Sequence, residues 1–269
     1  MSVTDVAFAG SIPALYEQHL GPLLFVPYAE DMAERVRGTS PRRVLETAAG
    51  TGIVTRAMAK ALPPDTEILA TDLNQAMLDL AATKLQAPNV RWQQTDAQTL
   101  PFQDASFDAV VCQFGAMFFP DKVKAYREAL RVLKPGGVFL FNVWDGLEAN
   151  PVSKIVHEAV ARLFPDDPPS FLGRVPFGYY DIDRIRGEVE QAGFEQVETK
   201  TVEKVSQAPS PLGPATGLCQ GSPLRGEIEA RASDSLHEVT DSVAEALAQR
   251  FGSSSFENRM SAIVVTTRR

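Results

Sequence analysis

Two acidic residues stand at positions from which they could hold a nucleotide. Glu46 precedes the run Ala48-Ala49-Gly50-Thr51-Gly52, in which the glycines allow a sharp backbone turn and the close approach of a ligand. Asp72 lies twenty residues beyond Gly52. A carboxylate at that spacing can accept hydrogen bonds from both hydroxyls of a ribose. The pair predicts a nucleotide site, and the alternative is a tight turn followed by a surface aspartate.

The residues after the turn indicate which nucleotide fits. A dinucleotide-binding turn follows the pattern G-x-G-x-x-G, whereas residues 50–55 read G-T-G-I-V-T and lack the third glycine. Glu46 lies in the turn region, where an acid is poorly placed for a phosphate but suits a cationic amino acid group. A nicotinamide-dependent oxidoreductase is therefore the weaker alternative.

Other reactive side chains give weaker signals. Cys112 ends an apolar segment without an obvious activating base, so a buried core cysteine is favoured over a nucleophile. His157 is a weak candidate for a general base, and Tyr16 for a contact to cofactor or acceptor. No Asp/Asp/Asn constellation points to a metal site. Aromatic residues that could line an apolar acceptor pocket, or equally pack in the core, are Phe25, Phe171, Phe177, Tyr179 and Tyr180.

Alternating strands and helices must position these residues. Short apolar segments are followed by segments whose apolar residues recur at helical spacing. Parallel neighbouring strands need crossover connections, so this alternation predicts a parallel, doubly wound α/β sheet. The five strands predicted in this part of the chain are 44–47, 67–71, 90–95, 107–112 and 138–144.

The remainder of the chain has a different character. Asn74, Asp121 and Asn150 are predicted to cap helices. Segments 165–178 and 206–226 are rich in proline, glycine or serine and predict loops, which at such length are usually functional or disordered. Two further strands, 195–205 and 260–267, are separated by an insertion of roughly fifty residues.

We therefore expect one domain with three parts. Residues 1–40 form an N-terminal helical cap, and residues 41–145 form the cofactor-binding core. Residues 146–269 form the substrate side and the closing strands, with lid insertions near 165–180 and 206–257.

Charge and composition narrow the class of partner. The chain has 26 Lys and Arg against 34 Asp and Glu, a net charge of −8, and its basic residues are scattered. A protein that grips nucleic acid concentrates basic residues against phosphates, so we expect a small-molecule partner and no nucleic acid. Two distant cysteines and the lack of a secretory signal or membrane span predict a cytoplasmic protein. A monomer and a homodimer both remain open.

The chain resembles the class I S-adenosylmethionine methyltransferases, particularly the small-molecule branch with the quinone-biosynthesis C-methyltransferases. The resemblance covers about residues 40–145, with the matching pieces in the family's order and spacing. It implies a Rossmann-like seven-stranded sheet of order 3-2-1-4-5-7-6 with the last strand antiparallel. The matching pieces are VLETAAGTG (44–52), TDLNQAML (71–78), TDAQTLPF (95–102), SFDAVVCQFGAMFF (106–119) and ALRVLKPGG (129–137).

The resemblance also implies residue roles for S-adenosylmethionine. The turn holds the methionine part, Asp72 the ribose, and Asp96 with the Ala97 amide the adenine. Ala48 departs from the family, which usually has glycine there, and its methyl narrows the turn. The cofactor-binding residues implied are Glu46, Thr47, Ala48, Ala49, Gly50, Gly52, Asp72, Leu73, Met77, Asp96, Ala97, Cys112, Gln113 and Phe114.

The favoured function is methyl transfer from S-adenosylmethionine to a small hydrophobic or aromatic acceptor. Two alternatives stay open: a catalytically silent protein that binds the cofactor and serves as a partner, and the nicotinamide-dependent oxidoreductase. The sequence does not identify the acceptor or its methylated atom.

Overall fold

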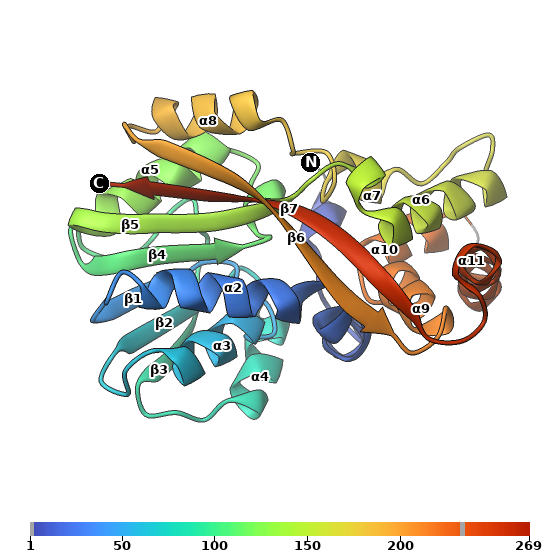
Figure 1. Ribbon diagram of the computed structural model, residues 1–269, viewed down its shortest axis with the longest axis horizontal. Coiled ribbons are helices and arrows are strands. Elements are labelled where there is room, and N and C mark those ends of the chain that lie inside the picture. Colours follow the sequence, from blue (N-terminus) through green and yellow to red (C-terminus); the bar gives the residue numbers. More distant parts are fainter. Residues whose placement is uncertain (1–2, 232–234) are drawn as a thin grey trace. The chain divides into compact units, whose positions relative to one another are not determined.

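The computed structural model describes residues 3–231 and 235–269 (Figure 1). Residues 1–2 of the predicted cap and 232–234 of the predicted second insertion lie outside the described residues. The chain divides into two compact units, which we describe separately. Unit 1 comprises 1–27, 145–178 and 203–261, and unit 2 comprises 28–144, 179–202 and 262–269.

A seven-stranded sheet of order β3-β2-β1-β4-β5-β7-β6 confirms the predicted topology. The pairs among β1 to β5 are parallel, whereas β7 runs antiparallel to β5. Strand β6 begins in unit 2 and ends in unit 1, whereas β7 begins in unit 1 and ends in unit 2. The strands are β1 (Arg43–Glu46), β2 (Glu67–Asp72), β3 (Val90–Gln94), β4 (Phe107–Gln113), β5 (Leu133–Trp144), β6 (Val197–Ala208) and β7 (Phe256–Arg268).

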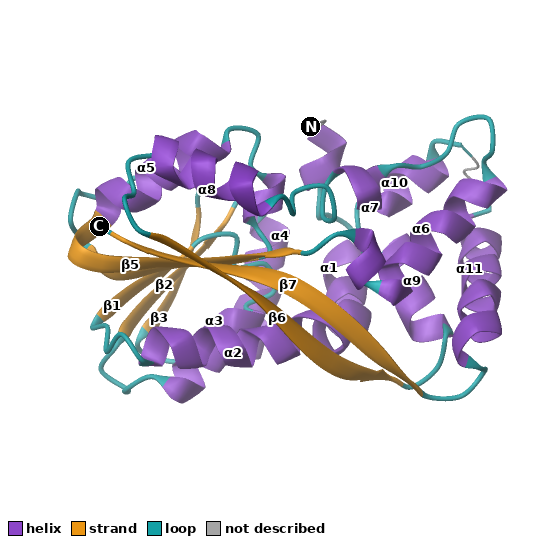
Figure 2. Ribbon diagram, turned by 45° about the horizontal axis from the view of Figure 1, so that its top comes forward, coloured by secondary structure: helices purple, strands orange, loops and turns teal. Residues whose placement is uncertain are grey.

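Helices accompany the parallel strands of unit 2 (Figure 2). Strands β4 and β5 are buried along almost their whole length, as expected when both faces of a sheet are covered. Asp121 caps its helix as predicted, accepting from the Lys124 amide at 2.9 Å. The helices are α2 (Val26–Arg37), which begins in unit 1, α3 (Ile53–Ala61), α4 (Gln75–Lys84), η3 (Ala116–Phe118), α5 (Lys122–Val132) and α8 (Ile182–Gln191).

Unit 1 is helical apart from its share of β6 and β7. Helix η2 has π-type turns, which suit Pro22 because proline donates no hydrogen bond to the usual carbonyl four residues back. The remaining elements are η1 (Val3–Val6), α1 (Ile12–Leu15), η2 (Tyr16–Phe25), η4 (Leu147–Ala149), α6 (Pro151–Leu163), α7 (Phe171–Arg174), α9 (Leu212–Gln220), α10 (Leu224–Glu229) and α11 (Leu236–Phe251).

Asn74 and Asn150 stand at the predicted N-cap positions of α4 and α6, but neither side chain makes a capping hydrogen bond, because each finds other partners. The Asn74 amide group donates to Asp72 at 3.4 Å. The Asn150 amide group donates to the carbonyls of Asp145, Gly146 and Ser261 at 3.1–3.2 Å.

The loop predicted at 206–226 is wrong, because that segment contains helices, whereas the one predicted at 165–178 is loop apart from a helix of 4 residues. Segment 165–178 contains α7, and segment 206–226 contains α9 and the start of α10. Pro211 and Pro223 stand immediately before α9 and α10, where proline's fixed backbone angle favours a helix start. Ala215, Leu218 and Cys219 are buried in unit 1, where α9 packs against η2 and α11. The burial of this apolar face outweighs the loop-like composition.

Gly217→Ala is expected to destabilise unit 1 by about 1–3 kcal/mol, because the added methyl overpacks a helix contact. An ideal Cβ at Gly217 would lie 2.5 Å from Leu20 Cδ2 and 3.0 Å from His19 Cβ. Gly226→Ala is the matched control, since an added Cβ there meets no described atom within 4 Å. Hydrogen exchange of α9 and η2 peptides should accelerate in the first variant and not in the second. Equal exchange rates would mean that α9 does not pack closely on η2.

Candidate functional site

The predicted cofactor residues gather at one edge of the sheet in unit 2. Strands β1, β2, β3 and β4 are parallel, so their carboxyl ends meet at the same edge. Asp72 pairs with Gln94, and Glu46 with Val111. Open α/β sheets bind their ligands at this edge.

The turn after β1 has three residues in the left-handed region of backbone space. Ala48 has a φ of 53°, Gly50 of 56° and Gly52 of 76°. Hydrogen bonds tie the turn to the neighbouring strands: the Thr47 amide donates to Val111 O and the Ala49 amide to Thr71 O, each at 2.9 Å. The turn therefore has a fixed shape in which backbone amides and carbonyls stand at the sheet edge.

The Asp72 carboxylate is held in place by the backbone around it. Oδ2 accepts from the backbone amide of Gly50 at 2.8 Å, and Oδ1 accepts from the backbone amide of Asn74 at 2.8 Å. Burial raises the pKa of Asp72, while these donors favour its charged form. A carboxylate offers about four lone-pair sites, so Oδ2 keeps capacity for a further donor, and Oδ1 for one that replaces the long 3.4 Å contact from the Asn74 side chain. Asp72 is thus preorganised to accept two hydroxyl groups.

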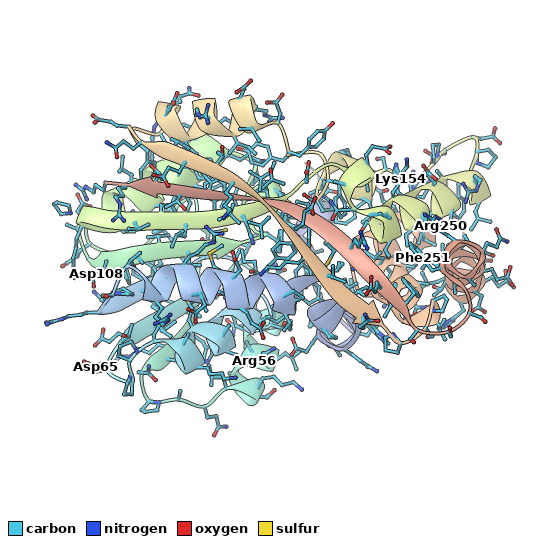
Figure 3. The ribbon with its side chains drawn as sticks, in the orientation of Figure 1. Arg56, Asp65, Asp108, Lys154, Arg250 and Phe251 are labelled. Carbon is cyan, nitrogen blue, oxygen red and sulfur yellow. The ribbon has the colours of Figure 1, made fainter. Side chains whose placement is uncertain are left out.

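Glu46 is a buried acid at the end of β1. It is 1% exposed, and its Oε2 accepts from the Thr55 hydroxyl at 2.6 Å. Burial raises the pKa of Glu46 to about 8. The hydrogen bond from Thr55 and the charge of Arg56 lower this pKa, whereas the nearby charge of Asp72 raises it. Arg56, on α3 (Figure 3), also donates to Thr51 O at 2.7 Å. At neutral pH the Glu46 carboxyl is therefore largely protonated.

Apolar side chains flank the turn. Leu73 is 49% exposed directly after Asp72, a surface suited to a flat apolar ligand group. Met77 is buried, with its methyl 3.8 Å from the Cβ position at Gly50. Trp92 is half-buried, and two of its ring carbons lie 2.6 and 3.2 Å from the Cβ position at Gly52, so the ring packs against the turn.

The third strand end presents Asp96 to solvent and leaves Ala97 half-buried. Asp96 Oδ1 accepts from the Gln98 amide at 2.8 Å, which fixes the carboxylate. The neighbouring Thr95 hydroxyl is buried and has no hydrogen-bond partner among residues 3–231 and 235–269. A ligand at this strand end can use the exposed Asp96 carboxylate and the Ala97 amide.

The fourth strand end is more deeply buried. Cys112 has no exposed surface, and burial raises the pKa of its thiol to about 12, so the thiol is neutral. Gln113 is half-buried and pairs with Asn142 in β5. Phe114 has a φ of 52° and stacks on Trp144 with ring centres 3.8 Å apart.

Tyr16 and His157 both belong to unit 1. The Tyr16 ring stacks on Phe25 at 4.8 Å and meets the Phe8 ring edge-on at 6.0 Å. His157, on α6, is half-buried, and its imidazole lies 3.4 Å from the Cβ position at Gly173.

Several residues that support this edge were not predicted from the sequence. Thr55 and Asn74 hold Glu46 and Asp72, and Asn142 accepts from the Phe114 amide at 2.9 Å. Asn142 was detectable, because it is the polar residue inside the apolar run VFLFNVW (138–144). A buried polar side chain needs partners and often fixes a neighbouring loop.

A family described as "Methyltransferase domain" matches residues 45–141. The ubiquinone/menaquinone biosynthesis C-methyltransferase of Proteus mirabilis is 32% identical over 169 residues, which cover 58% of this chain and 67% of that protein. The demethylmenaquinone methyltransferase of Lactobacillus johnsonii is 34% identical over 166 residues, covering 57% and 68%.

The chain belongs to the class I S-adenosylmethionine-dependent methyltransferases. Its fold agrees with that of the Haemonchus contortus phosphoethanolamine N-methyltransferase 2 solved with S-adenosylhomocysteine. That structure has a TM-score of 0.59 at 17% identity, covering 96% of this chain and 57% of that one. At this low identity, the similarity shows a shared fold and nothing more.

The residues at the sheet edge fit the family's cofactor, S-adenosylmethionine. Preorganised Asp72 offers acceptors for hydroxyls, Leu73 exposes an apolar surface, and the left-handed turn brings backbone groups to the edge. In the part of the chain that the structure describes, no cluster of three His, Cys, Asp or Glu side chains could hold a metal ion.

Within residues 3–231 and 235–269, no helix is long and apolar enough to cross a bilayer.

Proposed function

We propose that this methyltransferase transfers the methyl group of S-adenosylmethionine to a small aromatic acceptor of the quinone class. The observation that carries the proposal is the similarity to two relatives named for quinone biosynthesis, each at least 32% identical over more than half of this chain. The net charge of −8 and the scattered basic residues support a small acceptor over a nucleic acid.

For the cofactor, we assign roles to the residues at the edge of unit 2. Residues 46–52 hold the methionine part, and the Asp72 carboxylate accepts from the ribose hydroxyls. Leu73 and Met77 contact ribose and adenine, and Asp96 with the Ala97 amide binds the adenine edge. Residues 112–114 border the methionine end, with buried Cys112 contributing as part of the wall.

Bound S-adenosylmethionine supplies an electrophilic methyl group on a sulfonium sulfur. The protein's contribution is to orient that group toward the acceptor and to exclude water. A carbon acceptor also has to lose a proton, which calls for a base. His157 and Tyr16 remain the candidate groups for acceptor contact or proton removal.

The acceptor class can be tested by following a tritiated methyl group. We expect label from S-adenosylmethionine to enter a low-molecular-weight apolar fraction of a cell extract, and to enter added quinols. RNA, sheared DNA and protein fractions should stay unlabelled. Label in a polymer fraction would contradict the proposal, and cofactor binding with no turnover in any fraction would favour the catalytically silent alternative.

We also propose a cytoplasmic location and a chain that acts as a monomer or homodimer. The location is supported by two free thiols, Cys112 and Cys219, both buried. Light scattering of the purified protein, with and without cofactor, distinguishes the two assembly states.

A further inference from the structure

Ala48 adopts a backbone conformation that alanine normally avoids. Its φ of 53° lies in the left-handed region, where the Cβ of an L-residue crowds the following carbonyl. Such a residue persists only where its surroundings hold it in place. The bonds from Thr47 to Val111 and from Ala49 to Thr71, on both sides of Ala48, provide that restraint.

Gly115 faces Ala48 from the turn after β4. Its backbone is ordinary, with φ −94° and ψ −35°, so the conformation does not require glycine. Space does require it: an ideal Cβ at Gly115 would overlap the Ala48 methyl and lie 2.8 Å from Cys112 Sγ. The glycine is therefore explained by the volume that the Ala48 methyl occupies.

The two turns border different parts of the site. Ala48 belongs to the turn assigned to the methionine part of the cofactor. Gly115 follows Phe114, whose amide donates to Asn142 and whose ring stacks on Trp144. Tyr28 meets both of those rings edge-on, at 5.3 and 5.4 Å. A methyl group at position 115 would push the cofactor turn away from this rigid aromatic group.

We propose that Gly115 is a positioning residue for S-adenosylmethionine. Because Gly115 has no side chain, the Ala48 methyl group can pack directly against its backbone. This contact sets the shape of the turn at residues 46–52. The inference rests on the proposed role of that turn in holding the cofactor. It makes Ala48 and Gly115 an interdependent pair, in which the methyl group of one is tolerated only because the other has none.

A double-mutant cycle tests the pair, with S-adenosylmethionine affinity measured by calorimetry and stability by thermal unfolding. Gly115→Ala is expected to weaken binding by about tenfold or more, because overpacking costs about 1–3 kcal/mol and about 1.4 kcal/mol corresponds to tenfold in affinity. Ala48→Gly supplies the background in which Gly115→Ala is measured again, so that its own effect on affinity is subtracted in the cycle. The double variant should recover at least about threefold of the affinity lost in Gly115→Ala, with the remaining loss due to Cys112 Sγ.

Gly137→Ala is the matched control for crowding. Its added Cβ would lie 2.8 Å from Lys134 O and 3.1 Å from Asp108 O, in β5 near the opposite edge of the sheet. It should lower the melting temperature without changing affinity.

Two results would overturn the proposal: unchanged affinity in Gly115→Ala, or a double variant as impaired in binding or folding as Gly115→Ala alone. If Gly115→Ala does not fold, the double variant should still fold and bind. Asp72→Ala separates this inference from the proposed function. Normal S-adenosylmethionine affinity in Asp72→Ala would refute the proposed cofactor site itself, whatever the result for Gly115→Ala.

Discussion

Asp72→Ala is expected to bind S-adenosylmethionine roughly 10- to 150-fold more weakly than wild type. This range corresponds to losing charge-assisted hydrogen bonds worth about 1.5–3 kcal/mol. The carboxylate is fixed by the Gly50 and Asn74 amides before ligand binds, so little reorganisation offsets its contribution. Asp72→Asn should also bind weakly, because its amide nitrogen would face one of these N–H groups.

Asp108→Ala is the matched control for this measurement. Asp108 also accepts from two backbone amides, those of Arg42 and Arg43, at 3.1 and 2.8 Å. It lies near the amino end of β4 and is labelled in Figure 3. Asp72 is the last residue of β2, and both strands are parallel to β1, so the two acids lie at opposite edges of the sheet. Calorimetry should show normal affinity for folded Asp108→Ala. Unchanged affinity in folded Asp72→Ala would remove Asp72 from the site.

The fold of unit 2 was predictable because its strands are apolar and regularly separated by helices. The strand predicted at 67–71 occurs as β2 (Glu67–Asp72), and that at 107–112 as β4 (Phe107–Gln113). Strands covered on both faces leave near-continuous apolar runs, and the turn residues and helical segments between those runs separate them into strands. The order of β5, β7 and β6 came from the resemblance to the methyltransferases, because periodicity does not specify which strands pair.

Features that depend on distant contacts were not predictable. The helix α9 was predicted as loop, because its Pro and Gly residues are turn-like and its apolar face is buried only by other elements. Asn74 occupies the predicted N-cap position of α4, but its side chain reaches back two residues to Asp72, and the sequence does not decide between these local partners. Gly115 carries no sequence signal, since its role depends on a methyl group 67 residues earlier in the chain.

The stability of the protein is expected to depend on pH through the buried Glu46 carboxyl. The free energy of unfolding of wild type is expected to fall between about pH 5 and pH 8 relative to Glu46→Gln. The pKa of Glu46 is about 8 in the folded chain, against 4.5 for an ordinary glutamate. Across that window the unfolded state releases the proton and the folded state keeps it. The stabilisation is thus complete below pH 4.5 and lost as pH rises through 8.

The effect is on the order of a few kcal/mol, since each pKa unit corresponds to about 1.4 kcal/mol. Gln keeps the size of Glu46 and can still accept from the Thr55 hydroxyl, so the variant removes only the ionisation. Urea denaturation followed by tryptophan fluorescence reports on unit 2, which contains both Trp92 and Trp144. Glu67→Gln, at an exposed acid where β2 begins, should follow the wild-type curve. Parallel curves for wild type and Glu46→Gln would show that Glu46 is ionised in the folded protein, because a carboxylate charged in both states adds no slope with pH.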